Sequence, residues 1–77
     1  MTVHDAIRTL LTFRVNLLMT YRYCGGSVRD AAEAFGMTVP EIRQAEAGAH
    51  RTLMAAGYDV PTVAAAYREG RNAGRTA

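Results

Sequence analysis

The sequence predicts an all-α domain, a compact bundle of four to five short helices, from three observations. No segment of the 77 residues alternates apolar and polar side chains as a half-buried strand would. Apolar residues instead recur at helical intervals, and hydroxyl residues that cap helices precede these runs. Three of the runs end at glycine. One domain over residues 1–70 is therefore expected, with a flexible tail over residues 71–77.

Hydroxyl residues mark where the first two helices begin. Thr2 is followed three residues later by Asp5, which is a weak capping pair. A second helix starts after Thr12, covers residues 13–23, and is stopped by Gly25 and the glycine that follows it. The first helix is expected to bury one apolar face, made of Val3, Ala6, Ile7 and Leu10.

The next two helices carry stronger signals. Ser27 caps a third helix that ends at Gly36, where a positive φ is expected. Thr38 caps the fourth helix, Glu41 completes a Thr-x-x-Glu capping box, and Gly57 ends the helix. The buried stripe of this helix is predicted to be Ile42, Ala45, Ala49 and Leu53.

Composition excludes several classes of protein. The single cysteine, Cys24, allows no intrachain disulfide, and His4 and His50 lie too far from it to suggest a zinc site. There is no nucleophile beside a base, no paired acids and no phosphate-binding glycine loop. We therefore expect no enzyme, catalytic residue, cofactor, metal or small-molecule substrate.

Location and charge are also constrained. The longest apolar run is far shorter than the roughly 20 residues that cross a bilayer, so a cytoplasmic protein without membrane contact is expected. All nine basic residues are arginine against seven acids, which gives a net charge of +2. This balance is weaker than that of a protein that coats nucleic acid, although arginine suits bidentate contacts to phosphate or guanine.

The third and fourth helices have the spacing of a helix-turn-helix. Such a unit needs a small residue where the helices touch, a residue that adopts positive φ in the turn, and a branched apolar anchor in the second helix. Ala32, Gly36 and Ile42 occupy these three places.

The stretch "SVRDAAEAFGMTVPEIRQAEAGAHRTL", with "LTFRVNLLMTYRY" upstream, resembles region 4 of bacterial sigma factors, the domain that recognises the −35 promoter element. The likeness covers about residues 5–56 and rests on "IRQAEA" and "YRY" at the family's spacing. It implies a stand-alone domain, of a kind frequent in phages and mobile elements, that acts in transcription regulation.

The resemblance implies DNA contacts by the fourth helix. Arg43 and Gln44 match family residues that contact bases and backbone, and Thr38 and Arg51 are expected at phosphates. The DNA-facing tip, where the family has base-reading residues, is Val39, Pro40 and Glu41. Val39 offers only contact with a thymine methyl, so tight sequence-specific reading by one copy is not expected.

A second departure from the family lies in the second helix, where Phe13, Val15 and Leu17 replace mostly charged residues. Contiguous exposed apolar side chains usually mark an interface. The cover is either internal, by a fifth helix over residues 61–69 that includes Tyr67, or external, by a second copy or another protein.

Two functions remain open. The first is a small DNA-binding transcriptional regulator that binds double-stranded DNA as a homodimer. The second is a protein-interaction module that binds RNA polymerase or another host transcription protein without sequence-specific DNA reading.

Overall fold

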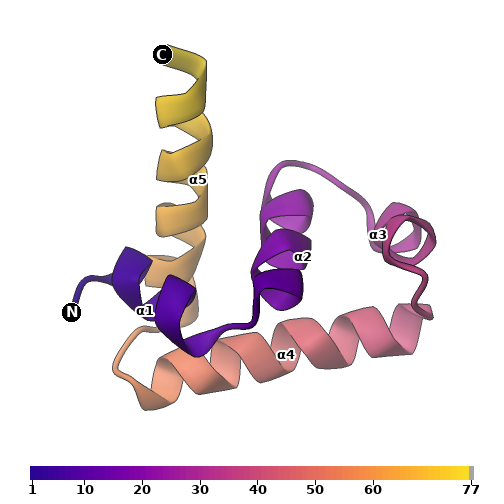
Figure 1. Cartoon of the computed structure of the whole chain (residues 1–77), viewed down its shortest axis with the longest axis horizontal. Coiled ribbons are helices and arrows are strands. Elements are labelled where there is room, and N and C mark those ends of the chain that lie inside the picture. The colour runs from indigo at the N-terminus through magenta and orange to yellow at the C-terminus, as the bar shows by residue number, and fades with distance from the viewer. Residues whose placement is uncertain (77) are drawn as a thin grey trace.

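Five helices make up the part of the chain that the computed structural model describes, which is the backbone of residues 1–76 and the side chains of residues 1–69 (Figure 1). No strand occurs in that part, so the predicted all-α class is confirmed. None of its helices is long and apolar enough to cross a membrane. The helices are α1 Val3–Leu10, α2 Phe13–Tyr23, α3 Val28–Phe35, α4 Val39–Ala55 and α5 Val60–Thr76.

Four helices begin where a hydroxyl cap is predicted. In each, the cap side chain accepts a hydrogen bond from the backbone N–H three residues on, which satisfies a group that has no partner within the helix. The boxes predicted at the starts of α1 and α4 are both complete. The caps are Thr2, Thr12, Ser27 and Thr38.

The fifth helix is longer than the predicted span of residues 61–69. It starts after Asp59, whose Oδ1 accepts a hydrogen bond from the backbone N–H of Thr62 at 3.0 Å. A glycine within a helix costs only about 1 kcal/mol relative to alanine, so the glycines after Glu69 need not end it. The tail expected over residues 71–77 lies outside the residues whose side chains are described.

The core consists of two clusters that meet at α2. Its neighbouring residues Leu18 and Met19 are both buried, and they point into different clusters. The first cluster joins α1, α2, α4 and α5 through Ala6, Ile7, Leu11, Met19, Ala49, Leu53, Val63 and Ala66. The second joins α2, α3 and α4 through Leu18, Ala31 and Ile42.

Both core clusters contain residues of α4. Figure 1 shows α1, α2 and α3 on one side of α4, with α5 rising from its C-terminal end. In the predicted stripe, Ile42, Ala49 and Leu53 are buried, while Ala45 is half-buried. Leu10 is expected in the apolar face of the first helix but is 41% exposed, because it ends α1 beside the turn to α2. Since α4 packs on one side only, its other side faces solvent.

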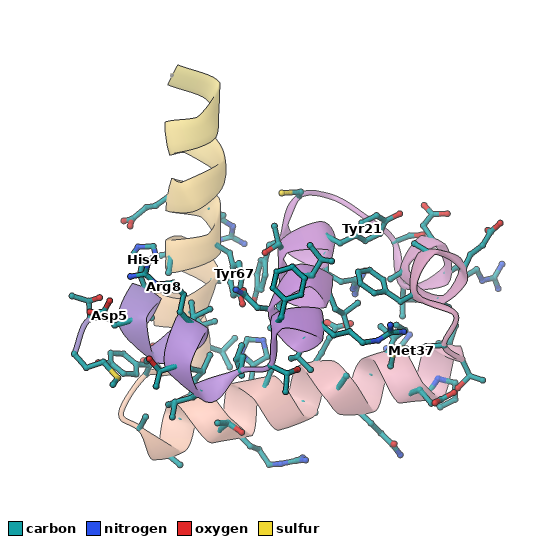
Figure 2. The ribbon with its side chains drawn as sticks, viewed as in Figure 1. His4, Asp5, Arg8, Tyr21, Met37 and Tyr67 are labelled. Carbon is teal, nitrogen blue, oxygen red and sulfur yellow. The ribbon has the colours of Figure 1, made fainter. Side chains whose placement is uncertain are left out.

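Tyr67 holds α5 against α2. It projects from α5 towards α2 (Figure 2), stacks on Tyr23 with ring centroids 5.1 Å apart, and donates a hydrogen bond to Oδ1 of Asn16 at 2.8 Å. Burial raises the pKa of Tyr67 to about 12. The internal cover predicted for α2 therefore exists in part. It reaches Asn16, Tyr23 and Val15, whereas Phe13 and Leu17 stay exposed.

Candidate nucleic-acid interface

The turn between α3 and α4 is built by backbone hydrogen bonds. Gly36 has φ +64°, as predicted, and the N–H of Met37 returns to the carbonyl of Ala32 at 2.9 Å. Ala31 is the fully buried small residue of α3, whereas Ala32, expected at the closest helix contact, is half-buried. Ala31 and Ile42 share the second core cluster, so apolar packing fixes α4 relative to α3.

The N-terminal end of α4 is occupied by its own cap. The Thr38 N–H and hydroxyl both donate to Oε1 of Glu41, at 3.1 and 2.9 Å, and the Glu41 N–H donates to the Thr38 hydroxyl at 3.3 Å. These hydrogen bonds hold the pKa of Glu41 below its usual value, so the carboxylate is ionised at neutral pH. Two of the residues predicted to contact DNA, Thr38 and Glu41, are thus hydrogen-bonded to each other. The negative charge of Glu41 also repels a phosphate at this end of α4.

The middle of α4 presents a different surface. Its side away from the core, called here the outer face of α4, consists of exposed residues that recur at helical intervals, and none of them is acidic. They include the predicted contacts Arg43, Gln44 and Arg51, whereas Val39 is half-buried beside the cap. The outer face is made of Pro40, Arg43, Gln44, Ala47, Arg51 and Met54.

Glu46 is absent from the outer face because it points inward. Its Oε1 accepts a hydrogen bond from Nε of Arg22 on α2 at 3.0 Å, with 23% of the Glu46 side chain exposed. Arg22 also donates to the carbonyl of Gly26 at 2.8 Å. In the sequence, α4 has no net charge, since it contains two arginines and two glutamates. The position of Glu46, four residues after Ile42, places it beside the buried stripe and could have shown its direction.

The predicted interface residues do not form one face. Phe13 is 82% exposed and Leu17 is 48% exposed, while Val15 packs against the first core cluster. Successive helix positions differ by about 100°. Val15, two positions from both Phe13 and Leu17, therefore lies almost on the opposite side of α2. Tyr67 contacts α2 from within the same chain. Of the four predicted interface residues, Phe13 and Leu17 are the two that stay exposed.

No metal centre is evident among the described residues, where no three His, Cys, Asp or Glu side chains form a group that could hold an ion. Cys24 is exposed. The Nε2 of His50 lies 3.3 Å from the Tyr23 hydroxyl, which gives this histidine a structural contact.

Comparison of this chain with protein-family models, with curated proteins and with solved structures gives no significant match. The likeness to sigma region 4 accordingly rests on the residues quoted for it, and the function is inferred from the geometry of α4.

Proposed function

We propose that the protein is a small transcriptional regulator that binds double-stranded DNA through the outer face of α4, with α3 and α4 acting as a helix-turn-helix. The observation that carries this proposal is the exposed surface with Arg43, Gln44 and Arg51 and no acidic side chain. The inward pairing of Glu46 with Arg22 supports it, because this pairing takes one of the two negative charges of α4 away from the outer face and leaves only Glu41, at the N-terminal end of the helix.

The length of the face fits a DNA groove. Arg43 and Arg51 are eight residues apart, which corresponds to about 12 Å along a helix axis at 1.5 Å per residue. The major groove of B-DNA is also about 12 Å wide. The two guanidinium groups can therefore reach backbone or base edges on either side of a groove that receives the middle of α4.

The same geometry argues for modest sequence discrimination. The tip of α4 carries half-buried Val39, Pro40 and the capped carboxylate of Glu41, none of which offers a hydrogen-bond donor to a base. Gln44 is the exposed amide on the outer face and can pair with adenine, an interaction worth about 1–3 kcal/mol. Most of the affinity should then come from arginine and phosphate, and it should fall steeply with salt.

Titration of the protein into labelled genomic duplex fragments, at several salt concentrations, tests this. We expect Arg43→Ala and Arg51→Ala each to lower the affinity. For each phosphate that an arginine no longer neutralises, the slope of log K against log salt should become shallower by about 0.9. Gln44→Ala should reduce the preference among sequences more than the salt slope.

Arg8→Ala is the charge-matched control. Arg8 lies on α1, is paired with Asp5 at 2.8 Å, and is on the side of α1 away from α4 (Figure 2). Its replacement should leave both affinity and slope nearly unchanged. An equal decrease in affinity for Arg8→Ala would show that DNA binding is not localised to α4. If no duplex binds at low salt and purified RNA polymerase retains the protein, the protein-interaction alternative replaces this proposal.

A further inference from the structure

Four exposed residues form a mostly apolar stripe along α2 and its C-cap. Phe13, Leu17, Thr20 and Cys24 repeat at intervals of four, three and four residues, so they lie on one side of the helix. This stripe lies opposite the side of α2 that carries Leu18 and Val15 to the two core clusters. Phe13 and Leu17 are 82% and 48% exposed.

The stripe is one wall of a groove, and α3 supplies the other. Ala34 and Phe35 line this groove together with Leu17, and the lining continues to Phe13 at one end and to Cys24 at the other. Tyr21 projects from α2 towards α3 (Figure 2), and its ring meets the ring of Phe35 edge-on at 5.9 Å. The α2–α3 groove, made of Phe13, Leu17, Thr20, Cys24, Ala34 and Phe35, is therefore mostly apolar, and the contact between Tyr21 and Phe35 joins its two walls.

Opposite charges lie at the two ends of this groove. Arg14 lines the end near Phe13, where its guanidinium donates to the carbonyl of Phe35 and lies 5.8 Å from the centre of that ring. Asp30 and Glu33 lie beside Tyr21 and Ala34 towards the other end. Within the described side chains, neither of these carboxylates forms an ion pair. The surface is thus basic at one end, apolar in the middle and acidic at the other end.

We infer that the α2–α3 groove is covered by the same surface of a second copy of this chain. The two α2 helices pack antiparallel about a two-fold axis. A two-fold axis perpendicular to α2 brings the Arg14 end of each copy to the Asp30 and Glu33 end of the other. A parallel pairing would place like charges together. This inference concerns self-association and is independent of DNA binding.

Side-chain volumes agree with the antiparallel arrangement. About a centre between Leu18 and Met19, Phe13 faces the partner's Cys24, and Leu17 faces the partner's Thr20. Every layer then combines one large and one small side chain, as well-packed interfaces require. In the parallel arrangement, Phe13 would face the partner's Phe13 and Cys24 would face the partner's Cys24. The first of these layers would be overfilled and the second underfilled.

Sedimentation equilibrium without DNA tests the surface. The wild-type protein should approach the mass of two chains as its concentration rises. Leu17→Glu should raise the dimer dissociation constant by about tenfold or more, because it places a charge in the apolar centre of the interface. Leu10→Glu is the matched control, since Leu10 is similarly exposed at 41% but lies outside the groove. It should leave the mass unchanged, and circular dichroism should show that both variants remain folded.

Disulfide cross-linking tests the orientation, using Cys24 as the native thiol. Under mild oxidation, Phe13→Cys should give a covalent dimer through Cys24 of the partner, and adding Cys24→Ser should abolish it. The wild-type protein should give little covalent dimer, because antiparallel packing keeps the two Cys24 side chains apart. A wild-type protein that cross-links readily through Cys24 would overturn the antiparallel arrangement. A monomer at all concentrations, or a dimer equally stable with Leu17→Glu, would overturn the interface itself.

Discussion

Gly48 lies in the middle of α4, and Gly48→Ala should stabilise the protein. A Cβ built at this position would meet only Nη2 of Arg51, at 3.8 Å, which is an ordinary contact with the flexible end of a side chain. The backbone of Gly48 is helical, so alanine adopts it without strain. Glycine in the interior of a helix is about 0.5–1 kcal/mol less favourable than alanine. We expect the free energy of unfolding to rise by about this amount.

Thermal and urea unfolding followed by circular dichroism measure this change. For a domain of this size, 1 kcal/mol shifts the midpoint by about 4–8 °C, so the expected increase is about 2–8 °C. The urea midpoint should rise while the slope of the transition stays constant, because the surface exposed on unfolding is nearly unchanged. An unchanged or lower midpoint would contradict the reasoning, since it would mean that the space beside Gly48 is needed within the folded chain.

Two other glycines serve as matched controls with the opposite sign. A Cβ at Gly26 would overlap the ring of Tyr21 at Cε1 and lie 2.9 Å from the Tyr21 carbonyl oxygen, so Gly26→Ala should displace this ring and destabilise the fold. Gly36→Ala places a side chain at φ +64°, where a residue other than glycine costs about 1–2 kcal/mol. Stabilisation by all three substitutions would indicate a general effect of alanine on the unfolded chain.

Two further predictions concern pH. Tyr67→Phe removes the hydrogen bond to Asn16 and should cost about 0.5–1.5 kcal/mol at neutral pH. The pKa of Tyr67 is about 12 when folded and 10.0 in the reference state, so the unfolded wild-type chain loses this proton first, and stability should fall as pH rises above 10. Urea unfolding from pH 7 to 11 should show a shallower fall in the Phe variant, and equal slopes would exclude this role for Tyr67. Glu41→Gln tests how stability depends on pH below neutral. Hydrogen bonds from Thr38 lower the pKa of Glu41 below its reference value of 4.5, so wild-type stability should decline as pH falls through and below 4.5. The Gln variant should lack that part of the decline in melts between pH 6 and 3, and an identical acid profile would refute the assignment.

The starts of four helices could be predicted because they depend on residues close together in the chain. A Ser or Thr cap and an acid three residues later satisfy backbone groups of the same turn, so Thr38 and Glu41 are recognisable without knowledge of the fold. The positive φ of Gly36 is equally local. The length of α5 was not predictable in the same way, because glycine weakens a helix without setting where it ends.

Packing alone decided which residues share a surface. The sequence groups Phe13, Val15 and Leu17 by their chemistry, but the helical rotation and the presence of two core clusters on α2 turn Val15 inward and leave the other two exposed. Glu46 counts in the sequence as one more charge of α4, whereas its pairing with Arg22 depends on α2 crossing α4 at that point. The sequence by itself therefore determined the helices and their caps. The tertiary structure decided the charge of the outer face of α4 and the shape of the α2–α3 groove, because both depend on contacts between residues distant in the chain.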